Sequence, residues 1–131
     1  IVFGGGVHAG GITGFELIRK NMRRLAGKKL IIFAVGLNVM QAETRKQLRD
    51  INFSKRKVRG LTCYYCPGAY DPDRVHGADA MLMKMMKKML KDKPDSDFTP
   101  EDRALLDAVE NGADLTDRRF IEPVVRAVRE T

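Results

Sequence analysis

The run Leu30–Val35 constrains the fold of this chain more than any other segment. Its residues (LIIFAV) are all apolar, and Gly36-Leu37-Asn38 follows directly. The run is too short for an ordinary helix, and a strand that is apolar on both faces is typical of a parallel sheet covered by helices. We therefore predict a buried parallel strand over residues 30–35.

The segment before this strand has the pattern of a strand followed by a helix. Ile1-Val2-Phe3 is apolar and is predicted to be the end of a buried strand. Apolar residues then recur at helical spacing over 15–25, and Gly27 is the predicted stop. Thr13 and Glu16 have the spacing of a capping box, so the helix is expected to begin there.

The segment after the strand repeats this alternation. Residues 41–52 are predicted to be a second helix, with Leu48 and Ile51 facing inward. Residues 58–66 are rich in β-forming residues and predict a third strand, which Pro67-Gly68 closes. Strands that alternate with helices indicate the α/β fold class.

The C-terminal half is predicted to be helical. Residues 79–92 form an amphipathic helix with one apolar stripe and an opposite lysine face. The stripe is Met81, Leu82, Met85, Met86, Met89 and Leu90, and the lysine face is Lys84, Lys87, Lys88 and Lys91. Thr99-Pro100 opens a helix that Gly112 ends. Thr116 is predicted to cap a last helical segment, which Pro123 kinks or restarts.

Six glycines lie within Gly4–Gly14, between the first strand and the first helix. Glycine lets backbone N–H groups approach a ligand closely, and α/β sheets bind cofactors at the carboxyl ends of their strands. The stretch has no Lys for a phosphate-binding Walker loop, and the second strand lacks the acidic residue of a dinucleotide site. A cofactor loop and a tight strand-to-helix turn both remain open at this point.

Several of these segments together resemble flavodoxin-domain proteins. Ile1–Gly14 and Lys28–Gly36 are similar to the third strand, its loop and the fourth strand of that family. The branch resembled is that of menaquinone-dependent protoporphyrinogen oxidase. Gly68-Ala69-Tyr70-Asp71 resembles its turn after the fifth strand, and the Met/Lys-rich helix and the acidic connector over 94–97 also match.

The resemblance implies a flavodoxin-like three-layer sandwich with a parallel sheet in the order 2-1-3-4-5. Here we expect strands 3–5 and the C-terminal helices, in a single domain over 1–131 that is incomplete at its N-terminus. The resemblance also implies FMN beside the loops that follow strands 3 and 4. The implied cofactor-binding residues are Gly5, Gly6, Val7, His8, Ala9, Gly10, Gly11, Gly36, Leu37 and Asn38.

The implied function is FMN-dependent electron transfer or oxidation, as in an oxidoreductase that acts on a porphyrinogen and passes electrons to a quinone or another redox partner. No catalytic side chain is assigned. The alternative is a non-enzymatic binding or assembly module on the same scaffold that has lost flavin binding. An unpaired first strand, Ile1-Val2-Phe3, would also favour association of copies of the chain through that edge.

The charge balance favours anionic partners. The chain has 131 residues with 24 Lys and Arg against 17 Asp and Glu, a formal net charge of +7. Basic residues gather within Arg19–Arg24, at Lys28-Lys29 and at Lys55-Arg56-Lys57. They lack a nucleic-acid-binding motif and interleaved aromatic residues, so no specific nucleic-acid partner is predicted. The lysine face of the 79–92 helix is compatible with an anionic membrane surface, but the favoured interpretation is a helix that packs on the sheet or at an interface with its lysines in solvent.

The remaining candidate residues are a histidine and two cysteines. His8 lies in the glycine-rich stretch, where it either contacts flavin or substrate or is a solvent-exposed loop residue. Cys63 and Cys66 have the spacing of a redox pair but lie in a predicted strand, so we expect two reduced, structural thiols and no metal site. So few cysteines indicate a reducing, cytoplasmic setting.

Overall fold

A parallel sheet organises the first of two units into which the chain divides. The computed structural model describes residues 1–130. Unit 1 comprises residues 1–67 and the segment from residue 116 onward, and unit 2 comprises residues 68–115. The single domain expected over 1–131 stays a prediction.

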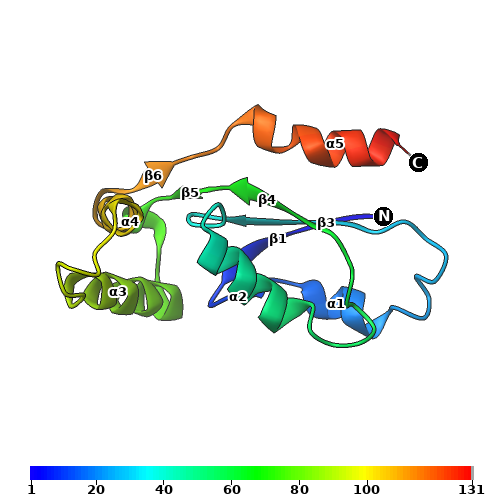
Figure 1. Ribbon diagram of the computed structural model, residues 1–131, viewed down its shortest axis with the longest axis horizontal. Coiled ribbons are helices and arrows are strands. Elements are labelled where there is room, and N and C mark those ends of the chain that lie inside the picture. The colour runs from blue at the N-terminus through cyan, green and yellow to red at the C-terminus, as the bar shows by residue number, and fades with distance from the viewer. Residues whose placement is uncertain (131) are drawn as a thin grey trace. The chain divides into compact units, whose positions relative to one another are not determined.

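The sheet of unit 1 has the order β2-β1-β3-β4. Its three longer strands, β1, β3 and β4, are labelled in Figure 1. Strands β1 (Val2–His8), β3 (Ile31–Gly36) and β4 (Cys63–Pro67) run parallel, and β3 confirms the buried strand predicted from the Leu30–Val35 run. Strand β2 (Gly11–Ile12) pairs antiparallel with the end of β1. The α/β, flavodoxin-like fold class is confirmed by this mostly parallel sheet with helices on its faces.

The register brings the ends of the parallel strands to the same edge. Gly6 of β1 lies opposite Val35 of β3, and Gly36 of β3 lies opposite Pro67 of β4. We call the edge where these strands end the carboxyl edge, and the edge where they begin the amino edge.

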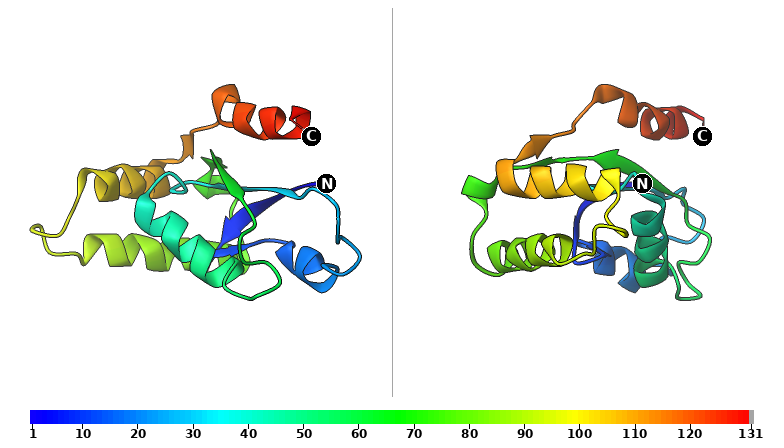
Figure 2. Two further views of the ribbon diagram at one scale, coloured as in Figure 1. Left: turned by 45° about the vertical axis from the view of Figure 1, so that its right-hand side comes forward. Right: turned by 60° about the vertical axis from the view of Figure 1, so that its left-hand side comes forward.

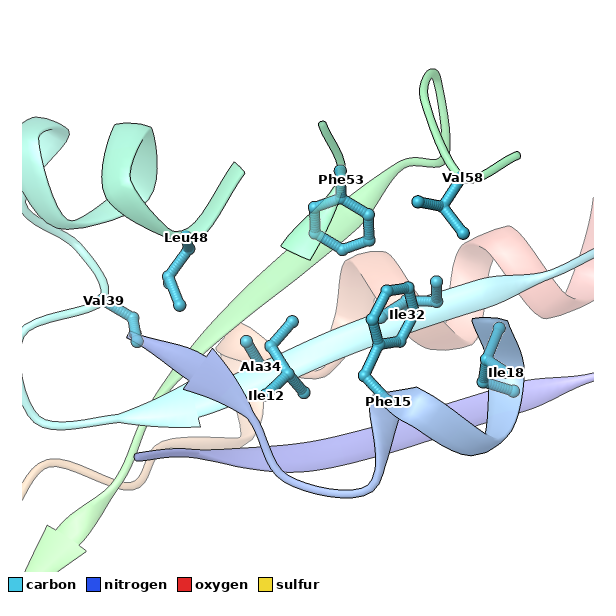
Figure 3. Packing of buried hydrophobic residues seen from close by; sticks show 9 residues of the cluster. All are labelled: Ile12, Phe15, Ile18, Ile32, Ala34, Val39, Leu48, Phe53 and Val58. Atoms are coloured by element: carbon cyan, nitrogen blue, oxygen red, sulfur yellow. The ribbon is translucent and has the colours of Figure 1, made fainter. Parts of the chain in front are cut away.

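Helices cover both faces of the sheet of unit 1. Helices α1 (Phe15–Lys20) and α2 (Ala42–Asn52) cover one face, and α5 (Glu122–Arg129) covers part of the other (Figure 2). The core beneath α1 and α2 contains Ile12, Phe15, Ile18, Ile32, Ala34, Val39, Leu48, Phe53 and Val58 (Figure 3). A smaller cluster of Ile31, Val124 and Ala127 fixes α5.

Helix α1 is shorter than the sequence predicts, and its predicted capping box is wrong. Its N-cap is Gly14 at φ +81°, with no side-chain cap. The Thr13 N–H instead donates to the Gly6 carbonyl at 2.9 Å, which holds Thr13 in the strand hairpin. The helix ends at Lys20. The side-chain amide of the next residue, Asn21, donates back to the Leu17 carbonyl at 2.8 Å, and turns continue to Gly27.

The predicted third strand is also too long, because β4 begins only at Cys63. Residues 55–60 form turns in which the N–H groups of Val58 and Arg59 donate to the Lys55 carbonyl at 3.0 and 2.9 Å. The Val58 side chain is buried in the core, so this apolar residue anchors a turn and does not belong to a strand. Gly60, at φ +90°, lies at the end of these turns.

The segment after residue 115 differs from the sequence prediction in its caps. Asp117, rather than Thr116, caps a short 3-10 helix, η2 (Arg118–Phe120). Pro123 lies in the first turn of α5, which agrees with the predicted restart of the helix at that proline.

Unit 2 contains two packed helices and a two-stranded sheet. Strand β5 (Ala69–Tyr70) pairs antiparallel with β6 (Ala113–Asp114), and a 3-10 turn, η1 (Pro72–Arg74), follows β5. Helix α3 (Gly77–Lys91) packs on α4 (Pro100–Asn111). The Thr99 cap and Gly112 stop are confirmed, and Thr99 and Asp102 form a reciprocal capping box.

The apolar stripe predicted on α3 is divided between two environments. Leu90 is buried, whereas Met81, Met85 and Met89 are 66, 56 and 71% exposed. The predicted lysine face is divided as well, because Lys87 and Lys91 lie 3.7 and 3.0 Å from the Glu110 carboxylate on α4. Over residues 1–130, no helix is both long and apolar enough to cross a bilayer.

Candidate functional site

The glycine-rich stretch is a β-hairpin rather than the loop or the strand-to-helix turn considered from the sequence. Strand β1 continues through its glycines to His8, and β2 pairs back with His8 opposite Gly11. Ala9 and Gly10 form the two-residue turn at φ +49° and +80°. Positive φ at both central residues is the requirement of the tight turns whose twist matches that of the flanking strands.

Packing or backbone conformation within the protein accounts for three of these glycines. A Cβ atom at Gly4 would overlap the Phe33 ring, and one at Gly5 would lie 2.5 Å from the Thr13 carbonyl oxygen. A Cβ atom at Gly10 would lie 2.6 Å from Ile51 Cδ1, in addition to the strain at its positive φ. These close approaches explain the glycines without a ligand.

Gly6, next to the end of β1, is different. A Cβ atom there would meet nothing within 4 Å, and its φ is not in the left-handed region. Gly6 is therefore the residue of the hairpin where the backbone faces open space at the carboxyl edge.

The loop after β3 lies beside the hairpin. Gly36 packs closely there, because a Cβ atom would lie 2.9 Å from Val39 Cγ1 and 3.2 Å from Val7 Cβ. Leu37 and Asn38 are half-buried, and the Gln41 N–H donates to the Asn38 carbonyl at 3.1 Å. The structure thus brings the two predicted groups of site residues together at one edge of the sheet.

Asn52, at the end of α2, holds the hairpin in place. Its side-chain oxygen accepts from the Ile12 N–H at 3.0 Å. Its amide donates to the carbonyls of Gly10 and Leu48 at 2.9 and 2.8 Å. Asn52 is buried and the neighbouring Ile51 is 46% exposed, so the sequence prediction that Ile51 faces inward is wrong.

Arg45, on the same helix, holds the loop after β3. Its Nε donates to the Val39 carbonyl at 2.8 Å, and its guanidinium lies 4.8 Å from the centroid of the Tyr65 ring. Sequence reasoning missed Arg45 and Asn52, although both fall at helical spacing with inward-facing Leu48. Polar residues at core positions of a helix were the signal that indicated a structural hydrogen-bond role.

Among the polar side chains at the carboxyl edge, Asn38 stands apart. Within residues 1–130 its amide has no hydrogen-bond partner, although the residue is half-buried. His8 lies at the end of β1 and has an interaction partner within the protein. The Asn38 amide can therefore donate to or accept from a ligand at this edge.

Cys63 and Cys66 are free thiols on β4, and their side chains lie on opposite faces of the sheet. Cys63 packs against the core beneath α2, whereas the Cys66 thiol donates to the Phe120 carbonyl at 3.6 Å. Burial raises the pKa of the Cys63 thiol to about 11 and also raises the pKa of Cys66. A redox CxxC pair instead has a thiol of lowered pKa, so the arrangement supports two structural thiols.

We expect Cys63 to resist alkylation in the folded chain. With its pKa raised to about 11, only about one Cys63 in a thousand is the reactive thiolate at pH 8. Mass spectrometry after brief treatment with iodoacetamide at pH 8 should find Cys63 unmodified, and unfolding in guanidinium should remove the protection. Rapid modification of Cys63 in the folded chain would contradict the buried-thiol assignment.

Throughout residues 1–130, no group of three His, Cys, Asp or Glu side chains is placed to hold an ion.

Comparison with known proteins adds a family to this geometry. Residues 1–97, about three quarters of the chain, match the family described as flavodoxin domain. The chain belongs to the flavodoxin domain family. No curated protein and no solved structure matches it. Flavodoxin domains typically bind FMN, and the matched residues include the parallel strands and both loops of the carboxyl edge.

Proposed function

We propose that this flavodoxin domain binds FMN at its carboxyl edge and takes part in electron transfer or oxidation. The observation that carries the proposal is the convergence of the hairpin and the loop after β3, with Gly36 packed on Val7. The two loops are also tied to one helix, through Asn52 and Arg45. In the family, this edge of the sheet is where the flavin binds.

The residues at this edge fit the ring of the flavin better than its phosphate. Leu37 offers an apolar contact, Asn38 an unpaired amide, and Gly6 an open approach to the backbone. The candidate residues include no Lys or Arg that would balance a phosphate dianion. The bound flavin supplies the redox chemistry, while these residues orient the ring and hydrogen-bond its polar edge.

A narrower form of the proposal concerns substrate and acceptor. Gly68-Ala69-Tyr70-Asp71 and the Met/Lys-rich helix resemble the protoporphyrinogen oxidase branch, which favours oxidation of a porphyrinogen with a quinone as acceptor. Met81, Met85 and Met89 of α3 are exposed, and Lys84 and Lys88 lie on the same helix. Such a surface supports peripheral contact with an anionic membrane that contains a quinone.

Asn38→Ala is expected to weaken FMN binding by about 5- to 10-fold, the loss of one hydrogen bond of about 1–1.4 kcal/mol. Riboflavin should bind the wild-type chain within about threefold of FMN, because the proposed contacts are to the ring. Both affinities are measured by quenching of flavin fluorescence. Asn21→Ala, which removes a side-chain amide on α1, is the matched control and should leave the affinity unchanged.

Absence of saturable FMN binding would instead favour the non-enzymatic assembly module. One observation supports that second candidate. Within residues 1–130, no strand pairs with the outer edge of β1 over residues 2–5, and open strand edges recruit other chains. A second copy of this chain is the proposed partner at that edge.

A further inference from the structure

A strongly basic surface lies at the amino edge of unit 1, opposite the proposed flavin site. Helix α1 and helix α2 both run away from the carboxyl edge. Helix α1 and the segments that follow the two helices hold ten Lys and Arg residues over 13–30 and 53–62. Glu16 is the single acidic residue in those two segments. The proposed FMN contacts leave this surface without a role.

Part of this surface is concave. A depression of about 400 Å³ lies between α1 and the turn over residues 55–58, within the size range of small-ligand pockets. Its charged lining is Glu16, Arg19, Lys20, Lys55, Arg56 and Lys57. We call it the basic depression.

The charges of the basic depression are largely uncompensated. Glu16 pairs with Arg19, so the single carboxylate is already engaged. No carboxylate of residues 1–130 forms an ion pair with Lys20, Lys55, Arg56 or Lys57. Like charges held around one hollow repel each other, and a bound multivalent anion would relieve that repulsion.

Arg19 adds a second observation. Its Nε atom is buried and has no hydrogen-bond partner within the described chain, although its terminal nitrogen pairs with Glu16. Buried donors without a partner are uncommon, and an ion or water is one usual explanation. The Nε–H of Arg19, a residue that lines the basic depression, is therefore a donor that no acceptor of residues 1–130 uses.

The backbones that carry these cations are rigidly placed. Ile18 of α1 and Val58 of the turn are buried in the same core cluster. The turn is closed by hydrogen bonds from Val58 and Arg59 to the Lys55 carbonyl. The basic depression therefore exists before any ligand binds, which lowers the cost of binding.

We propose that the basic depression binds an oligophosphate, an anion with two or more linked phosphate groups. Four unpaired cations around one hollow match several negative charges rather than a single one. Neither FMN binding nor the second candidate function is required for this site.

The test is isothermal titration calorimetry of the full chain with inorganic tripolyphosphate at pH 7. We expect one saturable site, weakened at high salt. Orthophosphate should bind at least tenfold more weakly than tripolyphosphate. Lys55→Gln/Arg56→Gln/Lys57→Gln should lower the affinity for tripolyphosphate by at least tenfold.

The matched control removes three exposed cations from other places, Lys84→Gln/Lys88→Gln/Arg129→Gln, and should change the affinity less than threefold. Equal losses in the two triple variants would overturn the proposal, because net charge alone would then explain binding. Binding to phosphatidylglycerol vesicles without saturable binding of tripolyphosphate would also overturn it, in favour of a lipid surface.

Circular dichroism identifies variants that fail to fold. If the triple variant fails to fold, single Lys55→Gln and Lys57→Gln variants replace it, each with an expected loss of affinity of at least twofold.

Discussion

Asn52→Ala is expected to lower the free energy of unfolding by about 3 kcal/mol. The buried side chain makes three hydrogen bonds, to the N–H of Ile12 and to the carbonyls of Gly10 and Leu48. Removing it leaves the Ile12 N–H without its partner, and a buried unsatisfied group costs about 1–3 kcal/mol. Urea denaturation followed by circular dichroism measures the change.

Asn21→Ala is the control for this loss, because the Asn21 amide makes one exposed hydrogen bond within the same unit. It should cost less than about 1 kcal/mol. Equal destabilisation by the two variants would show that Asn52 is not the residue that fastens the hairpin. Amide hydrogen exchange gives a second measure, since the Ile12 N–H should lose its protection in Asn52→Ala alone.

Gly5→Ala is expected to destabilise the chain by about 2–3 kcal/mol, whereas Gly6→Ala should be neutral or slightly stabilising. The new Cβ atom at Gly5 would lie 2.5 Å from a backbone oxygen, that of Thr13, which cannot move without opening the hairpin. The same atom at Gly6 meets nothing within 4 Å, and alanine reduces the entropy of the unfolded chain. Thermal unfolding of the two variants compares adjacent positions of one strand.

The Gly5→Ala and Gly6→Ala variants also distinguish the effect of packing on stability from an effect on flavin binding. If FMN approaches the open backbone at Gly6, Gly6→Ala weakens flavin binding while its melting temperature stays at the wild-type value. A large loss of stability in Gly6→Ala, or none in Gly5→Ala, would contradict the arrangement of the hairpin.

The sequence predicted the elements that local patterns determine. The apolar run over 30–35 is too short for an ordinary helix and must be buried on both faces, which predicts a buried strand. Strand β3 confirms that prediction. Thr99-Pro100 and Gly112 mark the two ends of α4 by their own backbone and side-chain preferences. Such signals act over a few residues, so they can be found without knowing the rest of the fold.

The errors lie where a distant residue decides the conformation. The Thr13 N–H donates to the Gly6 carbonyl, so Thr13 lies in the hairpin and does not cap the helix. Near the end of α2, Asn52 rather than Ile51 faces inward, because its side-chain amide hydrogen-bonds Ile12 and Gly10. The turn at Ala9 also carries no sequence signal, since alanine rarely adopts a positive φ. The site residues were named from family resemblance, and their convergence depends on strand register that no local pattern specifies.

Helix α2 has a consequence for how the carboxyl edge can change. It fastens the hairpin through Asn52 and the loop after β3 through Arg45, seven residues or about 10 Å apart along the helix axis. The spacing between the two loops is therefore set by the part of α2 between Arg45 and Asn52. Insertions or bends in that part of the helix would change the spacing, while the residues of the two loops stay the same.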